Sequence, residues 1–357
     1  MTTFRTAFHG PRQLRLRSRG QRIALLLPLR SLIVLLGLAV ALLAVIGISV
    51  ANGSYPVPLA EVFAALTGSD AVDPQMALIV REFRLPRSLA AALAGVLFAV
   101  SGACLQAITR NPLADPSLVG VSQGAGVAVL IVLVALPVIP VSAVPLAAML
   151  GAFVVVGLMY ALAGRDGGNT VRFILTGIGV GAFLGAVSSL LITYGELERV
   201  MTAMVWLAGS VHAAGWGDVA LLATWVALVL PVMLSASRGL NAMLLGEATA
   251  VGLGLPVRRV LVITVVAAVA AAAGAVSAVG TLGFVGLVAP HVARLLVGER
   301  QGMLLVASAL VGAVLVAAAD MIGRLAFAPV QLPAGIVTAL IGVPYFIALL
   351  WQRRHSL

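Results

Sequence analysis

Long apolar runs alternate with short polar segments along the chain. The clearest run, residues 88–109, contains no charged side chain and lies between Arg84-Leu-Pro-Arg87 and Arg110-Asn-Pro-Leu-Ala-Asp-Pro116. A helix of these 22 residues would rise about 33 Å at about 1.5 Å per residue, enough to cross the apolar core of a bilayer. We therefore predict a membrane-spanning helix with a polar segment at each end.

The same criterion predicts ten spans. Residues 116–164 carry no charge over 49 positions, too many for one helix, and three prolines divide them into a hairpin of two spans. Residues 196–218 carry Trp206 and Trp216, which favour a membrane interface, so we expect a short surface helix there. The glycines and Pro290 that follow the seventh span predict a short, broken eighth span. The spans are residues 31–51, 88–109, two within 116–164, then 173–195, 219–237, 260–279, 280–294, 303–323 and 333–351.

The arginines predict the orientation. Ten crossings place both termini on one side, and cytoplasmic termini put 17 of the 22 arginines inside, as the positive-inside rule favours. Residues 1–30 carry seven arginines and no acid, so we expect a cytoplasmic basic arm that can lie on anionic lipid, with the transmembrane domain at residues 31–357. The arginines left outside are Arg81, Arg84, Arg87, Arg199 and Arg324.

Composition narrows the function. With 62% hydrophobic and 10% charged residues and a mean hydropathy of +1.15, the chain is expected to be an all-α, polytopic membrane protein. It contains no lysine, so it is not itself a standard P-loop ATPase. The four histidines lack metal-ligand spacing, and no span has an obvious acid at mid-depth for proton or sodium coupling. We expect no enzyme activity, and an energy source in another chain.

Two patterns concern helix packing. Gly177, Gly181 and Gly185 recur at every fourth residue and make one smooth face, suited to close packing or to lining a solute pathway. Residues 94–100 and 273–279 have similar sequences in spans that run in opposite directions. Such similarity is typical of the inverted repeats of transporters, here spans 2–5 and 7–10.

The loop around residues 238–257 is too polar to cross a membrane. Its residues 242–251 favour a short helix that ends at glycines. Met243, Leu244 and Leu245 would then face water, which indicates a docking segment for a soluble partner.

A series of short motifs runs from about residue 81 to residue 351. They are Arg84-Leu-Pro-Arg87, Ser101-Gly102 with Gln106, Arg110-Asn-Pro-Leu-Ala-Asp-Pro116 with Gly120 and Gly124, Leu245-Gly-Glu247 with Gly252-Leu-Gly254, Phe284-Val-Gly-Leu-Val-Ala-Pro-His291 with Arg294, and Asp320 with Leu332-Pro333-Ala-Gly335. In order and spacing the chain resembles the FecCD-type permease subunits of binding-protein-dependent ABC importers for ferric siderophores, haem and cobalamin. Where that family usually has Glu-Leu-Pro, this chain has Gln331-Leu-Pro333.

The resemblance implies a type II ABC importer permease fold in the bacterial inner membrane. It implies a second permease subunit, as a homodimer or a paralogue heterodimer, two cytoplasmic ATPase subunits that hold the ATP and Mg, and an external binding protein. No cofactor in this chain and no nucleic-acid partner are expected. Ferric siderophore is the first choice of substrate, and haem and cobalamin are alternatives. A secondary exporter of a bulky amphipathic solute and a structural membrane subunit remain open as other classes.

The resemblance also assigns roles to residues. Docking of the binding protein falls to Arg84, Arg87 and Arg324. Coupling to the ATPase falls to Met243, Leu244, Leu245, Gly246, Glu247, Gly252 and Gly254. The cytoplasmic gate is expected at Asn111, Pro112, Leu113, Asn169, Thr170 and Val171, and the pathway lining at Gly177, Gly181 and Gly185. Asp320 and Arg324, four residues apart on one span, are expected to pair as a structural clip.

Overall fold

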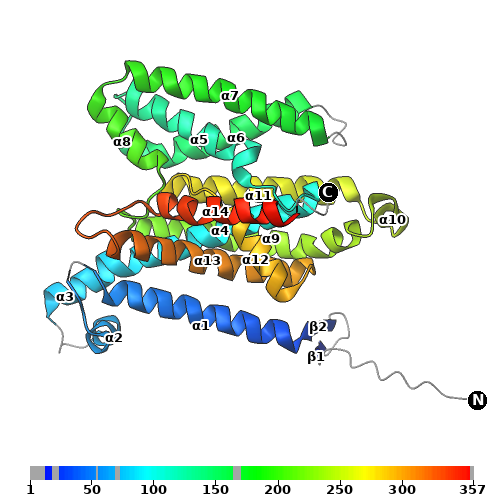
Figure 1. Cartoon of the computed structure of the whole chain (residues 1–357), viewed down its shortest axis with the longest axis horizontal. Coiled ribbons are helices and arrows are strands. Elements are labelled where there is room, and N and C mark those ends of the chain that lie inside the picture. Colours follow the sequence, from blue (N-terminus) through cyan, green and yellow to red (C-terminus); the bar gives the residue numbers. More distant parts are fainter. Residues whose placement is uncertain (1–12, 18–23, 54, 69–72, 164–169, 354–357) are drawn as a thin grey trace, which may run out of the picture.

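The computed structural model describes residues 13–17, 24–53, 55–68, 73–163 and 170–353. Most of these residues are helical, and Figure 1 shows the helices running roughly alongside one another. The N-terminal region adds a hairpin, in which β1 (Gln13–Arg17) pairs antiparallel with β2 (Ala24–Pro28). The sequence had predicted only a basic arm at this position.

The helices follow in chain order. The first half contains α1 (Leu29–Ala51), α2 (Leu59–Thr67), α3 (Pro74–Leu78), η1 (Ile79–Arg84), α4 (Leu85–Thr109), η2 (Pro116–Val119), α5 (Val121–Leu130), η3 (Ile131–Ala135), η4 (Val141–Ala143) and α6 (Val144–Ala163). The second half contains α7 (Thr170–Tyr194), α8 (Leu197–Leu207), α9 (Trp216–Met243), α10 (Glu247–Gly252), α11 (Val257–Val279), α12 (Val285–Val297), α13 (Gln301–Leu325) and α14 (Ala334–Arg353).

Each predicted span coincides with a helix, and residues 197–207 form the short helix expected between spans five and six. In the described part of the chain six helical stretches are long and apolar enough to cross a membrane, and four more are apolar but shorter. The chain is therefore a multi-pass membrane protein. The count of ten crossings and the inverted repeat stay predictions.

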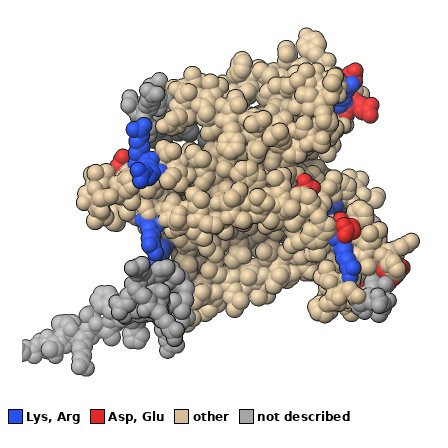
Figure 2. Space-filling model, turned by 180° about the vertical axis from the view of Figure 1, so that it is seen from behind, with Lys and Arg blue, Asp and Glu red and all other residues tan. Residues whose placement is uncertain are grey.

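The two ends of the molecule differ. In Figure 1 the hairpin, α10 and the C-terminal end of α14 lie toward one end, which we call the α10 end. Helices α2, α3 and α8 and the loop between α13 and α14 lie toward the opposite end, the α2 end. Figure 2 shows that the charged side chains on the face drawn there gather toward these two ends and leave the middle without charge. This distribution is what a membrane-spanning surface requires.

Helix α4 lies at the centre of the bundle. In the long helical stretch Pro74–Thr109, 83% of the residues in an apolar segment of 18 residues are buried, whereas only 11% are buried in the corresponding segment of α1. Helix α4 packs on α9, α11, α12 and α13. The peripheral helix α1 instead exposes apolar side chains such as Leu36 and Leu43, as a lipid-facing helix does.

Glycines bring the central backbones into direct contact. A Cβ atom on Gly95 of α4 would collide with the carbonyl oxygen of Gly312 in α13, and a Cβ atom on Gly312 would collide with that of Gly95. A Cβ atom on Gly102 would collide with the carbonyl oxygen of Gly286 in α12. Close approach through small residues is how membrane helices gain packing energy, because lipid supplies no hydrophobic force between them.

We predict that Gly95→Ala lowers the stability of the purified protein, because the new methyl group pushes against backbone that cannot rotate away. Overpacking of this kind costs about 1–3 kcal/mol. A thermal unfolding scan in detergent should show a lower midpoint.

The matched control is Gly157→Ala on α6, where a Cβ atom would meet nothing within 4 Å. That substitution should leave the midpoint unchanged or raise it, since alanine favours a helix over glycine by up to about 1 kcal/mol. Equal midpoints for the two variants would contradict the close α4–α13 crossing.

Candidate functional site

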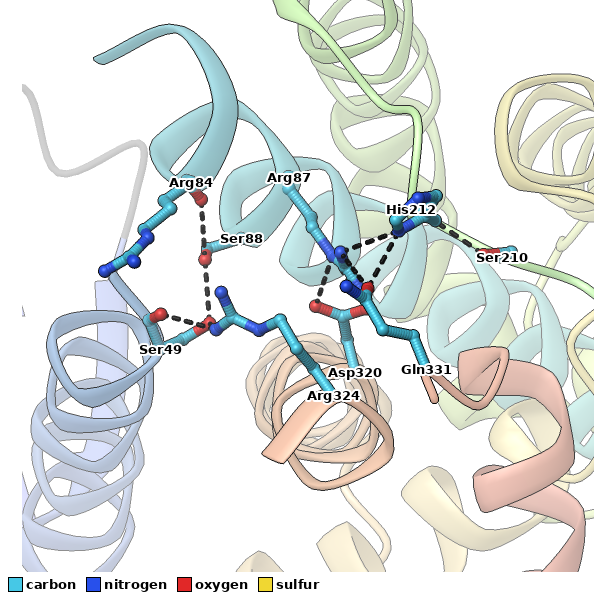
Figure 3. Close-up of polar contacts among 9 residues, drawn as sticks. All are labelled: Ser49, Arg84, Arg87, Ser88, Ser210, His212, Asp320, Arg324 and Gln331. Carbon is cyan, nitrogen blue, oxygen red and sulfur yellow. Dashed lines mark hydrogen bonds and ion pairs between the residues drawn. The ribbon is translucent and has the colours of Figure 1, made fainter. Parts of the chain in front are cut away.

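A buried cluster of arginines lies at the α2 end of the bundle (Figure 3). Arg84 ends the π-helical turn η1 and Arg87 follows in the first turn of α4, so both project from the start of the central helix. Asp320 and Arg324 lie four residues apart in the last turns of α13, which packs on α4. The crossing of α4 and α13 therefore brings three cations and one carboxylate together.

Arg87 forms the ion pair of the cluster. Its Nε lies 3.1 Å from Oδ1 and 3.0 Å from Oδ2 of Asp320, and its Nη2 lies 2.8 Å from Oδ1. The expected clip between Asp320 and Arg324 is therefore wrong: the carboxylate binds the guanidinium of Arg87, whose planar fork reaches both oxygens. The Asp320 side chain is only 2% exposed, so this pair is nearly dry.

Two exposed side chains cover Arg87 from outside. Its Nη1 donates to Oε1 of Gln331 at 2.9 Å and lies 3.0 Å from Nδ1 of His212. The same Nδ1 lies 2.8 Å from Oε1 of Gln331. Gln331 comes from the loop between α13 and α14, and His212 from the loop between α8 and α9. Arg87 thus joins two loops and two helices.

Arg84 and Arg324 hold the end of α1. The Nη1 of Arg84 donates to the carbonyl oxygens of Val50 at 2.8 Å and Ala51 at 3.1 Å, and its Nη2 donates to the carbonyl oxygen of Tyr55. The Nη2 of Arg324 donates to Oγ of Ser49 at 2.9 Å and to the carbonyl oxygen of the same residue. The last carbonyls of a helix lack partners within the helix, and cations satisfy them well.

This geometry adds a structural role to the three arginines that were expected to dock the binding protein. Arg84, Arg87 and Arg324 are only 7%, 8% and 8% exposed, and each is committed to bonds within the chain. A partner that approaches this end meets the exposed Gln331 and His212 before it meets a guanidinium. A docking role for the three arginines stays a prediction, and their structural role stands beside it.

Sequence reasoning missed His212 and Ser49 as members of this cluster. His212 was considered only as an unpaired histidine, and Ser49 lies in an apolar run with no motif around it. Gln331 did give a signal, because it departs from the usual glutamate of the family that the chain resembles.

The predicted coupling segment lies at the α10 end. Leu244 and Leu245, in the turn before α10, are 47% and 68% exposed, as expected. Glu247, the first residue of α10, is exposed as well. The expected exposure of Met243 is wrong. Helix α9 extends to this residue, six residues beyond the end of the predicted span, and the Met243 side chain is buried with Leu240 and Ala250.

Glycines bound the short helix α10. Gly246 precedes it with a φ of 106°, Gly252 is its last residue, and Gly254 follows with a φ of 79°. The predicted helix over residues 242–251 is thus divided in two, because Gly246 adopts a backbone conformation that breaks a helix.

The coupling segment contacts the far end of α4. Ala107 and Ile108 of α4 pack against the buried cluster of Leu240, Met243, Ala250 and Val257. The guanidinium of Arg110 donates to the carbonyl oxygen of Met243 at 3.2 Å. Helix α4 therefore connects the arginine cluster at one end with the coupling segment at the other.

The structure describes part of the predicted gate. The Oδ1 of Asn111 accepts a hydrogen bond from the backbone nitrogen of Leu113 at 2.9 Å, which makes a local turn around Pro112. Nearby, the pKa of Asp115 is raised above its ordinary value, because the effect of burial exceeds that of the hydrogen bonds from Ser117, which lower it. Asn169 lies outside the described residues. Thr170 and Val171 begin α7.

Helix α7 carries the predicted pathway glycines at the edge of the bundle. Gly177 is half-buried, and a Cβ atom on Gly181 or Gly185 would meet nothing within 4 Å. The face is therefore open in this chain and available to a second chain or to a solute. Among the described residues no cluster of three or more His, Cys, Asp or Glu could hold a metal ion.

We predict that Arg87→Leu strongly destabilises the protein, because it leaves the carboxylate of Asp320 buried without its cation. Breaking one side of a buried pair costs about 3–5 kcal/mol. The double variant Arg87→Leu, Asp320→Leu should recover much of the thermal unfolding midpoint.

The matched control is Arg199→Leu, which removes an exposed pair with Glu196 whose N–O distance is 3.0 Å. Exposed pairs contribute about 0–1 kcal/mol. If Arg87→Leu shifts the midpoint no more than this control, the pair with Asp320 does not hold the cluster.

Comparisons with known proteins agree with the resemblance seen in the sequence. The profile of the FecCD transport family matches residues 41–352. The chain is 41% identical over 330 residues to the probable siderophore transport system permease protein YfhA of Bacillus subtilis, covering 91% of this chain and 95% of that protein. It is 37% identical over 307 residues to the cobalamin import system permease protein BtuC of Halobacterium salinarum, covering 86% and 82%.

A solved structure supports the fold. It is described as an inward-facing conformation of a metal-chelate type ABC transporter, and it matches with a TM-score of 0.80 at 28% identity over 89% of this chain and 99% of that one. The chain therefore belongs to the FecCD transport family of membrane permease subunits.

Proposed function

We propose that this chain is the permease subunit of an ATP-binding-cassette importer and forms the pathway for an iron–siderophore complex. One observation carries the proposal: a single central helix, α4, connects the arginine cluster at one end of the bundle with the exposed apolar coupling segment around α10 at the other. An importer needs this connection, because a binding event outside must be linked to ATP hydrolysis inside.

The orientation follows from charge. Most of the arginines in the described part of the chain lie at the α10 end, and we assign this end to the cytoplasm of a bacterial inner membrane, with both termini on that side. The α2 end then faces outward, toward the binding protein that would deliver the substrate.

The partners follow from the exposed segments. Leu244 and Leu245 are apolar side chains exposed at the cytoplasmic end, and they would insert into one of two ATPase subunits that hold ATP and Mg. The open glycine face of α7 suits a second permease copy or the substrate pathway between the two copies. Residues 111–113 and 169–171 would close that pathway at the cytoplasmic end.

Motion of the ATPase would reach the pathway through α4. Because Ile108 packs on the coupling cluster and Arg110 bonds to Met243, a displacement of α10 moves the inner end of α4. The glycine contacts with α12 and α13 then pass the displacement to the rest of the bundle, since packed backbones cannot slide independently.

The proposed substrate is inferred from the relatives of this chain. The relative named for siderophore transport shares 41% of its residues with this chain over the aligned region, and the relative named for cobalamin import shares 37%. Ferric siderophore is therefore the first choice, and cobalamin or haem is the alternative within the family. No contact in the described residues favours a secondary exporter.

We predict ATP-driven uptake of a ferric siderophore into proteoliposomes that contain this chain, its ATPase and its binding protein. Leu245→Asp should abolish uptake and co-purification of the ATPase, because a carboxylate would be buried at an apolar contact. Uptake of labelled substrate and the amount of bound ATPase are the measurements.

The matched control is Val138→Asp, which adds the same charge at an exposed apolar position in the loop between η3 and η4. It should leave ATPase binding intact. Transport of haem or cobalamin in preference to ferric siderophore would contradict the substrate, and transport without any ATPase would contradict the class. If Leu245→Asp still couples ATP hydrolysis to uptake, the coupling assignment is wrong.

We further predict that Gln331→Glu slows docking of an acidic binding protein. The variant keeps an oxygen that can accept from Arg87 but adds a negative charge at an exposed position. Rim charges mainly change association rates, and salt screens them. Stopped-flow association should therefore be several-fold slower at low salt and nearly unchanged at high salt.

Gln75→Glu serves as the control, because it makes the same change on the exposed side of α3 at the same end, away from Arg87. Direct charge reversal of Arg84 or Arg324 is less informative, since it would also uncap α1. Equal rates for the two variants at low salt would exclude docking over the arginine cluster.

A further inference from the structure

A groove of about 680 Å³ lies between α10 and the first turns of α11. It lies at the α10 end, away from the arginine cluster. Arg258 and Arg259 line it, together with the apolar side chains of Val262 and Ile263 and the carboxylate of Glu247. Its volume is within the range of about 300–1,000 Å³ that is usual for small-molecule sites.

The two arginines of the groove lack partners. Arg258 and Arg259 are exposed, and neither makes a hydrogen bond or an ion pair within the described chain, unlike the three arginines of the buried cluster. They also follow directly on the start of α11, where the helix dipole is positive and cations are unfavourable. Helix stability therefore does not explain them, and a bound anion would offset both effects.

An apolar track leads away from the arginines. Val262, Ile263 and Val266 are exposed at helical spacing after Arg259, so they continue the same face of α11 for two turns. From residue 267 to the end of the helix nearly every side chain is buried. The exposed face thus begins at the membrane surface with two cations and continues with apolar side chains toward the bilayer core.

We propose that this groove binds an anionic phospholipid from the leaflet at the α10 end. The phosphate lies on Arg258 and Arg259, and the acyl chains lie along Val262, Ile263 and Val266. Basic pockets beside membrane helices on the cytoplasmic face suit anionic headgroups. Glu247 would repel a second phosphate but can accept hydrogen bonds from headgroup hydroxyls, so phosphatidylglycerol fits the mixed lining.

A bound lipid would bridge two elements. Glu247 begins α10, and the arginines begin α11, so a headgroup between them holds α10 against the bundle. Gly246 and Gly254, on either side of α10, have positive φ values, so glycine turns connect α10 to α9 and α11. Lipid occupancy would therefore bias the position of the coupling segment.

The test uses the full chain, purified in mild detergent and titrated with phosphatidylglycerol or phosphatidylcholine in native mass spectrometry. The wild-type protein should retain phosphatidylglycerol in preference to phosphatidylcholine. The double variant Arg258→Gln, Arg259→Gln should lose about thirtyfold in that preference, as expected for two cations at a membrane surface that each contribute about 1 kcal/mol. The measurement needs no ATPase or substrate, so its result is independent of the proposed function.

Arg238→Gln is the matched control, because it removes one exposed arginine without a partner from α9, outside the groove. An equal loss in this variant would indicate diffuse attraction and overturn the proposal. A third variant, Val262→Ser, Ile263→Ser, should also weaken retention. If it does not, or if inorganic phosphate displaces the ligand, the groove binds an anion and not a lipid. Displacement of the lipid by the ATPase would assign the groove to that partner.

Discussion

The contact of α4 with its neighbours through bare backbone is the constraint on which the rest of the structure depends. In a bilayer, apolar side chains are as stable against lipid as against protein, so helices associate through close packing and polar bonds. Gly95, Gly102, Gly286 and Gly312 provide that closeness by leaving no side chain between the helices. Because α4 packs directly on α12 and α13 in this way, the residues at its two ends are positioned relative to those helices.

The arginine cluster shows how one end uses this rigidity. A buried charge is costly unless a partner and further hydrogen bonds satisfy it. Asp320, Gln331 and the last carbonyls of α1 supply those bonds, so the cations are both part of the fold and a source of positive potential at the surface. In the proposed docking mode a partner would feel this potential through the exposed Gln331 and His212, and the local fold need not open.

The opposite end is built for adjustment. Helix α10 is short, lies between two glycines with positive φ, and packs through only a small cluster around Met243 and Ala250. Its neighbouring groove combines two free cations with an apolar track, whereas the cations at the other end are buried and bonded. The central helix thus joins an end that is held by a buried ion pair and hydrogen bonds to an end that is held by glycine turns and a small apolar cluster, an arrangement that suits the proposed coupling of a binding event to ATP hydrolysis.

The sequence by itself determined where the long apolar helices lie, though not all of their ends, because a bilayer forces each apolar run to satisfy its own backbone hydrogen bonds. It also determined the family, through motifs whose order and spacing are local properties. Only the tertiary structure decided that Arg87 pairs with Asp320, a residue 233 positions away and closer in sequence to Arg324. It decided likewise that Met243 is buried and that Gly95 meets Gly312. These outcomes depend on how helices cross, and the crossing is set by contacts between residues far apart in the chain, which no local pattern encodes.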